Sequence, residues 1–243
     1  MWNYFNPVEI IFGENRFKEV HDALKNKNYI IITHPEEIFK KYSDELKSSS
    51  NPPLSIMTDV QPNPDYKDIL ELQKKFSSIN ESVDYILAIG GGSVTDTAKA
   101  IAAFKDKQEY LTDFVRNKKS PRVENPIKII AVPTTSGTGA EVTMNSVLTN
   151  SSTKQKATIK FPSLFPKVAI IDPELTLTLP PQITGMTGFD AFTHALESFM
   201  NTKRSEFSDM IAMQSMKLSI DYLPQTIEKM DYLEGREKCA WSS

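Results

Sequence analysis

The first half of the chain alternates between short apolar runs and longer amphipathic segments. Five runs rich in apolar and β-branched residues predict buried β-strands, at residues 8–12, 29–33, 54–58, 85–89 and 127–132. Amphipathic segments between them predict helices, at residues 16–25, 36–46, 66–76 and 93–104. Because strands and helices alternate with short connections, we expect parallel pairing through right-handed crossovers. The predicted fold class is therefore α/β, with a Rossmann-like parallel sheet.

The pattern changes in the second half of the chain. Residues 134–160 are polar and rich in Thr and Ser, which we interpret as a hairpin, and one more strand is expected at 168–171. No strand candidate follows Pro181, whereas apolar residues at helical spacing predict a helix with one buried stripe: Met210, Met213, Met216, Ile220 and Leu223. The longest loop candidate is 105–125. We therefore predict a dinucleotide-binding α/β domain over residues 1–179 and an incomplete, all-helical metal-binding and substrate domain over 180–243.

Composition narrows the class of protein. The 243 residues are 40% hydrophobic and 24% charged, as in an ordinary globular protein, and the net charge of -3 leaves no basic excess for nucleic acid. No apolar run is long enough to cross a bilayer, and the first residues do not resemble a secretory signal. The single cysteine, Cys239, excludes an internal disulfide and a cysteine-built metal site. We expect a cytoplasmic enzyme or small-molecule binder, with no nucleic-acid or membrane partner.

The clearest candidate for ligand binding is a glycine turn. The predicted strand at 85–89 continues directly into Gly90-Gly91-Gly92-Ser93, and a predicted helix follows. Such a turn points several backbone N–H groups at one place, next to the positive end of the helix dipole, and diphosphate is the natural ligand. We place Asp96 in the first turn of that helix, to compensate the dipole or to accept a hydrogen bond from a cofactor. A plain strand-to-helix turn is the alternative.

A second polar cluster follows the predicted strand at 127–132. Residues 133–141 interleave four hydroxyl side chains with Gly137 and Gly139. Open α/β sheets bind ligands at the C-terminal ends of their strands, and this segment begins at such an end. We therefore expect it to form a hydrogen-bonding surface for a ligand, with an ordinary polar loop as the alternative.

A carboxylate and an imidazole stand four residues apart in the helical half of the chain. Asp190 and His194 would lie on one helix face and could converge on one ion. Iron, zinc and other divalent first-row ions all accept this pair of ligands. The alternative is a hydrogen bond on a helix surface, which is the commoner role of such a pair. The other histidines, His21 and His34, have no ligand-like spacing.

Together these segments resemble the iron-containing (group III) alcohol dehydrogenase family, and the resemblance extends through the whole chain. The matching motifs, in the family's order, are Asn6-Pro7, Phe12-Gly13, Pro62-Asn63-Pro64, Gly90-Gly91-Gly92-Ser93 with Asp96 and Lys99, the segment 133–143, Asp172-Pro173-Glu174-Leu175, and Gly188-Phe189-Asp190 with His194, Ala195 and Glu197. Several motifs in one order are far more specific than any one of them.

The resemblance implies a nicotinamide cofactor, NAD or NADP, across the sheet domain, and a divalent metal, with iron favoured over zinc. The residues it implies for the cofactor are Asn63, Gly91, Gly92, Ser93, Asp96, Thr134, Thr135, Thr138, Thr143 and Lys156. Asp190 and His194 match the first two of four metal ligands, and no further catalytic side chain stands out. The implied function is an oxidoreductase that interconverts an alcohol and an aldehyde or ketone by hydride transfer. A homodimer is also expected.

The chain departs from the family pattern at His34. Many family members carry an aspartate after the second strand, whose carboxylate pairs with the adenosine ribose, and His34 stands at the corresponding position. Loss of this carboxylate removes a repulsion against a 2′-phosphate, so we predict that NADP(H) is tolerated or preferred. Alternatively, His34 and Pro35 only open the next helix.

A second departure concerns the metal. The family supplies two more metal-binding histidines downstream, but no histidine follows His194 here. We therefore expect either the front part of a longer enzyme or a truncated product, in which apolar faces around Met210 and Leu223 would be uncovered. The alternative function is a non-catalytic dinucleotide-binding remnant. The opening residues Trp2, Tyr4, Asn6 and Pro7 also resemble a branch with phosphonoacetaldehyde reductases, whereas the loop 133–139 argues against the zinc-binding glycerol dehydrogenase branch.

Overall fold

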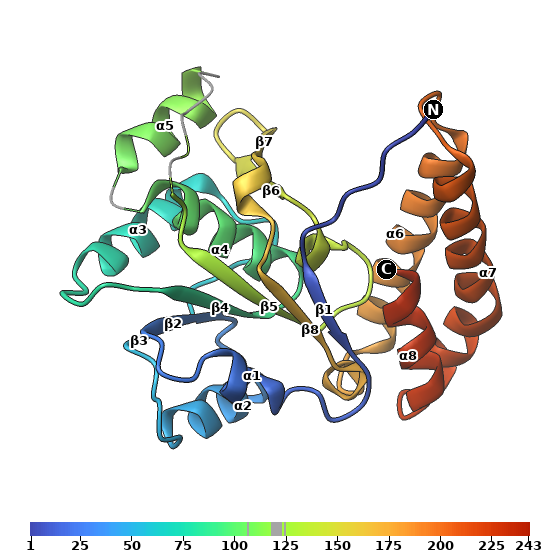
Figure 1. The fold of residues 1–243 in the computed structure, drawn as a ribbon, viewed down its shortest axis with the longest axis horizontal. Coiled ribbons are helices and arrows are strands. Elements are labelled where there is room, and N and C mark those ends of the chain that lie inside the picture. The colour runs from blue at the N-terminus through green and yellow to red at the C-terminus, as the bar shows by residue number, and fades with distance from the viewer. Residues whose placement is uncertain (106, 118–122, 124) are drawn as a thin grey trace.

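The computed structural model describes residues 1–105, 107–117, 123 and 125–243. Their centre is a parallel sheet of six strands in the order β1-β8-β5-β4-β2-β3 (Figure 1). The strands of this sheet are β1 (Glu9–Phe12), β2 (Tyr29–Thr33), β3 (Ser55–Met57), β4 (Tyr85–Gly90), β5 (Lys128–Pro133) and β8 (Val168–Ile171). The Rossmann-like parallel sheet expected from the apolar runs is confirmed.

Helices cover both faces of the sheet, because alternate residues of each buried strand point to opposite sides. In β2, Ile30 and Ile32 belong to one core cluster while Ile31 belongs to the other. The first cluster packs against α3 (Tyr66–Ser77), α4 (Gly92–Phe104) and α5 (Gln108–Asn117). On the opposite face lie α1 (Glu19–Ala23) and α2 (Glu37–Lys47), as Figure 1 shows. Burial on both faces explains why these strands are nearly continuous apolar runs.

The order of the strands fixes where a ligand can bind. Counted from β2, the strands β3-β2-β4-β5-β8 follow the 2-1-3-4-5 order of a doubly wound sheet. In that order the direction of winding reverses between the first and third strands, which are β2 and β4 here. Ligands bind at this switch point, outside the C-terminal ends of the strands. His34 follows β2, and the glycine turn begins at the end of β4, so both lie at the switch point.

An antiparallel hairpin stands beside the sheet, as the polar segment predicts. Its strands are β6 (Asn145–Asn150) and β7 (Gln155–Lys160), preceded by the short 3-10 helix η1 (Ala140–Val142). Two further short helices, η2 (Pro162–Leu164) and η3 (Pro173–Thr176), flank β8. The expectation of one long loop over residues 105–125 is wrong for its central part, because α5 is an amphipathic helix that buries Leu111 and Val115. Residues 106, 118–122 and 124 of that stretch lie outside the described residues.

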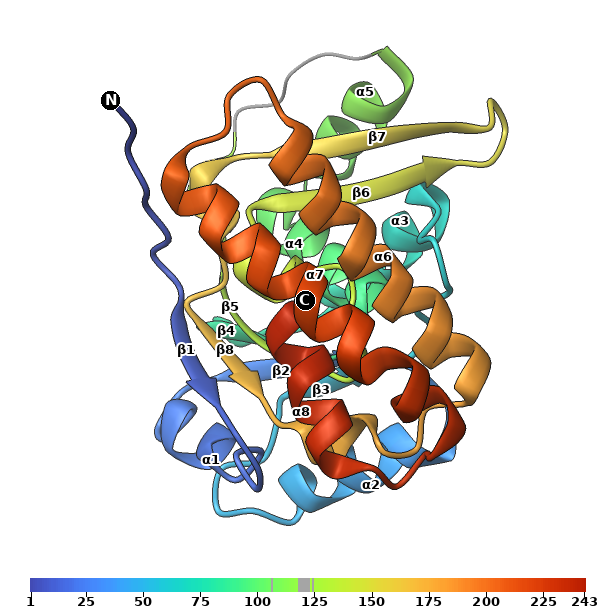
Figure 2. The same ribbon diagram turned by 90° about the vertical axis from the view of Figure 1, so that its right-hand side faces the viewer.

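After Pro180 the described residues form helices joined by short turns, and no strand, as expected. Helices α6 (Pro181–Met200), α7 (Glu206–Glu228) and α8 (Leu233–Ser242) form a layer in which α6 and α7 lie side by side (Figure 2). Ala240 of α8 packs on Ala169 and Ile171 of β8 and joins this layer to the sheet. None of the helices within the described residues has the combination of length and apolar character that a membrane crossing requires.

The expected buried stripe of α7 is wrong for three of its five residues, whose side chains face solvent, whereas Met216 is half-buried and Leu223 lies against Gly188 of α6. Met210, Met213 and Ile220 are each more than half exposed. The buried residues of α7 are instead mostly small or polar: Ala212, Ser215, Leu218, Ser219 and Thr226. Small side chains let helices approach closely, and helical spacing alone does not say which of two faces packs. Apolar side chains around Met210 are therefore exposed on α7 in this structure.

Candidate functional site

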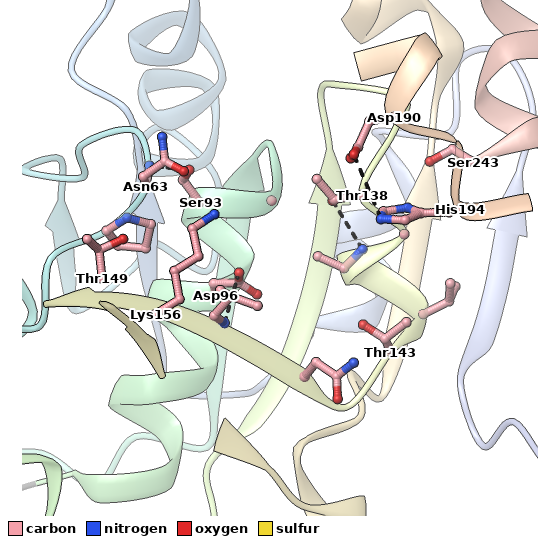
Figure 3. Close-up of a pocket in the computed structure, with 17 residues that line it drawn as sticks. Asn63, Ser93, Asp96, Thr138, Thr143, Thr149, Lys156, Asp190, His194 and Ser243 are labelled. Carbon is pink, nitrogen blue, oxygen red and sulfur yellow. Dashed lines mark hydrogen bonds and ion pairs between the residues drawn. The ribbon is translucent and has the colours of Figure 1, made fainter. Parts of the chain in front are cut away.

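A cleft with a volume of about 710 Å³ lies between the switch point, the hairpin and α6 (Figure 3). The residues that line it are Asn63, Pro64, Gly92, Ser93, Asp96, Thr138, Gly139, Ala140, Val142, Thr143, Asn145, Val147, Thr149, Lys156, Asp190, His194 and Ser243. Nine of these were singled out from the sequence: Asn63, Gly92, Ser93, Asp96, Thr138, Thr143, Lys156, Asp190 and His194. Segments far apart in the sequence therefore converge on one cavity.

The glycine turn after β4 places the N-terminus of α4 at this cleft. Gly91 caps the helix with an extended backbone, and the helix begins at Gly92. The first N–H groups of a helix have no partner within it, so those of Gly92 and Ser93 are suited to an anion. The Ser93 hydroxyl accepts a hydrogen bond from the backbone N–H of Asn63 at 3.2 Å. This bond leaves the hydroxyl proton of Ser93 available as a further donor.

The glycine turn and the threonine-rich segment form one packed unit. A Cβ added at Gly92 would lie 2.7 Å from Thr138 Cγ2, and one added at Gly91 would lie 2.9 Å from Thr135 Oγ1. Both distances are shorter than any ordinary contact of a side chain. The two glycines are therefore required for the close approach of the threonine segment to the turn, in addition to exposing backbone N–H groups.

Asp96 lies at the floor of the cleft, in the second turn of α4. The prediction that it stands in the first turn is wrong, because α4 begins at Gly92 and its first turn carries no acidic residue. One carboxylate oxygen of Asp96 accepts a hydrogen bond from the Val147 N–H at 3.1 Å. Burial raises the pKa of Asp96 to about 6, against the opposing effects of Lys99, the Val147 bond and Lys156. Asp96 thus joins α4 to β6, and burial holds the pKa of its carboxyl above the ordinary value.

Asp190 and His194 line the end of the cleft formed by α6. Their side chains are 3.8 Å apart, from Oδ1 to Nε2, and each is about half exposed. The pair has the geometry of two adjacent ligands on one helix face, as the spacing predicts. Among the described residues, no cluster of three or more His, Cys, Asp or Glu side chains could hold a metal ion. The described residues therefore bring together two candidate ligands, Asp190 and His194, and no set of three.

Four of the predicted cofactor residues do not line the cleft. Gly91 and Thr135 lie immediately behind it, in contact with each other. The Thr134 N–H donates to the Gly90 carbonyl at 3.2 Å, and its buried hydroxyl has no hydrogen-bond partner in the described structure. His34 is half-buried at the end of β2, with Nδ1 3.2 Å from the Val60 carbonyl oxygen and its ring against Phe39.

Other residues of the cleft wall were missed by the sequence analysis. Asn145, Val147 and Thr149 line the cleft from β6, whereas the residues between them are buried. The burial alternates with the period of a strand, but polar and apolar residues occur on both faces of β6, so the sequence carries no signal for the face that lines the cleft. The hairpin was expected, but the face that it turns toward the cleft was not assigned.

The fold and the cleft define a class of protein: a doubly wound α/β sheet followed by a helical layer that contributes to the same cleft. The family profile described as "Iron-containing alcohol dehydrogenase" matches residues 7–173, and that of the family's C-terminal part, "Fe-containing alcohol dehydrogenase family, C-terminal", matches residues 184–243. These matches cover most of the chain. The chain belongs to the iron-containing alcohol dehydrogenase family.

Individual relatives agree with this assignment. The chain is 32% identical to the NAD-dependent methanol dehydrogenase of Bacillus methanolicus, over 100% of this chain and 64% of that protein. It is 36% identical to the NADPH-dependent butanol dehydrogenase of Clostridium saccharobutylicum, over 94% of this chain and 59% of that protein. The solved structure of the sulfoacetaldehyde reductase of Bifidobacterium kashiwanohense in complex with NAD+ superposes with a TM-score of 0.90 at 34% identity. The superposition covers 100% of this chain and 65% of that one. The chain thus spans less than two thirds of the length of these relatives.

Proposed function

We propose that this chain forms the cofactor-binding part, and two of the metal ligands, of an iron-dependent NAD(P) oxidoreductase that interconverts an alcohol with an aldehyde or ketone. The observation that carries the proposal is the shared cleft, in which the glycine turn after β4 and the pair Asp190 and His194 line one cavity. Its volume of about 710 Å³ falls within the usual range of ligand pockets, roughly 300–1,000 Å³. A cytoplasmic location and a homodimer are part of the proposal.

The chain's own residues fit a dinucleotide at the switch point. The backbone N–H groups of Gly92 and Ser93 would bind the diphosphate, with the ammonium group of Lys156 compensating its charge. Asp96 would accept a hydrogen bond from a ribose hydroxyl, and Thr138 and Thr143 would line the cofactor. A bound nicotinamide supplies or accepts the hydride.

The metal fits only in part. Asp190 and His194 are ligand types that iron and zinc accept, and a divalent ion bound there would polarise the substrate oxygen. Catalytic zinc sites typically have three protein ligands, one more than the described residues bring together. A second candidate function is a dinucleotide-binding protein without catalysis, which would bind cofactor and retain no stoichiometric ion.

The choice between NAD and NADP depends on His34 in this proposal. The end of β2 at the switch point carries an imidazole where a carboxylate would repel a 2′-phosphate. We therefore propose that NADPH binds at least as well as NADH. The relatives named above include one NAD-dependent and one NADPH-dependent enzyme.

The substrate class proposed is a short-chain alcohol or its aldehyde. Relatives of this chain are named for methanol and butanol. The similarity to a sulfoacetaldehyde reductase supports an alternative, a short aldehyde with an anionic head group such as phosphonoacetaldehyde. Reduction of butyraldehyde and of phosphonoacetaldehyde by one enzyme preparation would distinguish the two classes.

Equilibrium titration with NADPH and NADH tests the cofactor site directly. We expect saturable binding of one dinucleotide per chain, weakened about tenfold in Lys156→Ala, since a hydrogen bond to a charged group contributes roughly 1.5–3 kcal/mol. Lys160→Ala is the matched control, because Lys160 lies on the same strand and outside the cleft. Equal affinities of the two variants would contradict the assignment of this cleft. Metal analysis of the same samples separates the two candidate functions.

A further inference from the structure

Lys99 is a fully buried cation directly beneath the cleft. It lies on α4, seven residues after the helix begins at Gly92, with none of its surface exposed. Its Nζ donates to the carbonyl oxygens of Ala140, at 2.6 Å, and Asn145, at 2.8 Å. Both of these acceptors are uncharged, and the sequence analysis gave Lys99 no role beyond its place in a motif.

The two carbonyls mark the ends of one wall of the cleft. Between them runs the segment 140–145, which contains η1 and leads into β6. Four of its residues line the cleft: Ala140, Val142, Thr143 and Asn145. One ammonium group therefore holds both ends of this segment against α4, the helix whose N-terminus forms the glycine turn.

The electrostatics argue against a role in stability alone. A buried charge without an ionic partner in close contact is costly, and an apolar residue of similar size would fill such a position at less cost. Burial lowers the pKa of Lys99 to about 8, opposed by the charges of Asp96 on the same helix and Glu141 on the held segment. No ion pair within 4.0 Å is found for Lys99 among the described residues. The specific interactions that Lys99 makes are therefore its two hydrogen bonds to the backbone carbonyls of Ala140 and Asn145.

Asp96 holds the continuation of the same wall. Its carboxylate accepts from the Val147 N–H, and its backbone carbonyl accepts from the Ser146 hydroxyl at 2.7 Å. The wall is thus bound to α4 along its length, by Lys99 at the segment 140–145 and by Asp96 at the start of β6.

We propose that Lys99 is a positioning residue for the dinucleotide, which fixes the segment 140–145 at the distance from the glycine turn that the cofactor requires. This inference rests on the proposed function of the cleft. Lys99 is buried and would touch no ligand, yet it would affect the affinity of the cleft for the cofactor.

The test compares Lys99→Met with Arg236→Met. Arg236 is also a buried cation, and it donates to the Thr184 hydroxyl and to the carbonyls of Leu179 and Met230 in the helical layer. Each variant removes a buried cation from backbone carbonyls, but only Lys99 adjoins the cleft. We expect Lys99→Met to raise the Kd for NADPH at least tenfold and Arg236→Met to leave it within twofold, at temperatures where both are folded. Equal weakening by the two variants would overturn the proposal.

Hydrogen–deuterium exchange provides a second readout that does not depend on the cofactor. Lys99→Met should accelerate amide exchange in 140–147 by tenfold or more, and Arg236→Met should not. If the wild-type chain binds no dinucleotide, the proposed function fails, while unchanged exchange in Lys99→Met refutes the positioning role itself. Should Lys99→Met not fold, Lys99→Arg, which keeps a cation with several donors, must bind NADPH more tightly than Lys99→Gln. The reverse order would also refute the role.

Discussion

At the scale of single residues, the cleft is built from close contacts that composition and spacing do not reveal. The chain has nine glycines, and their clustering predicts where backbone is approached closely. The sequence does not reveal which residues make the close approach. In the structure these are Thr135 at Gly91 and Thr138 at Gly92, from a segment more than forty positions away. Such pairings depend on the strand order, which brings β4 and β5 together, and no local pattern encodes them.

Replacement of His34 by Asp should change the cofactor preference. A carboxylate at the end of β2 would accept a bond from a ribose 2′-hydroxyl and repel a 2′-phosphate. We expect His34→Asp to raise the Kd for NADPH about tenfold or more relative to that for NADH, as measured by titration. His34→Asn is the control that changes shape without adding charge. A wild-type chain that clearly prefers NADH would contradict the interpretation of His34.

The pKa of Asp96 predicts a pH-dependent stability. Because burial raises the pKa of Asp96 to about 6 from an ordinary value near 4, the folded chain binds this proton more tightly than the unfolded chain. Asp96 therefore costs stability increasingly as the pH rises from about 4 to 6, and the cost persists above pH 6. Asp96→Asn should be more stable than wild type at pH 7, by on the order of 2 kcal/mol, and about equal at pH 4. Urea unfolding at both values measures this, and a constant difference between them would refute it.

At the scale of elements, the strands were predictable and the packing of the helices was not. Strands buried on both faces give apolar runs that stand out in any window, so β2, β4, β5 and β8 were located to within a residue or two. Helix α7 buries mostly small and polar residues, such as Ala212 and Ser215, and leaves its methionines Met210 and Met213 exposed. Size and helical period favour the methionine face, but they do not reveal that Ser215 and Thr226 meet α8.

Substitution of two glycines by alanine tests how closely α6 must approach the segments that pack against it. A Cβ at Gly137 would lie 2.5 Å from the backbone oxygen of Thr187, so Gly137→Ala should force the threonine-rich segment away from α6 and cost about 1–3 kcal/mol. A Cβ at Gly185 would meet only the terminal methyl of Ile227, at 3.3 Å. Gly185→Ala, inside α6, should therefore be neutral or stabilising by up to about 1 kcal/mol. Thermal unfolding of both variants checks the contrast, which a similar loss in each would contradict.

At the scale of the whole molecule, the two halves of the proposed site differ in completeness. The glycine turn, the threonine-rich segment and the hairpin all lie within the described residues and enclose the cofactor end of the cleft. The end proposed for the metal has two candidate ligands, both on α6 and both about half exposed. The sequence analysis led to the same expectation, because no histidine follows His194, and the fold is needed to show that no carboxylate among the described residues joins the pair to make a cluster of three.

The same asymmetry predicts that cofactor binding and metal binding are separable in this chain. Two ligands leave a divalent ion mostly coordinated by water, so iron or zinc should fall well below one ion per chain after gel filtration. Treatment with a chelator should then leave the Kd for NADPH within about twofold, because the N–H groups of α4 and the ammonium of Lys156 bind the diphosphate without a metal. His194→Ala should abolish the residual metal binding and spare the dinucleotide. Stoichiometric metal that resists the chelator would show that further ligands complete the site, and the oxidoreductase proposal would then gain over the non-catalytic alternative.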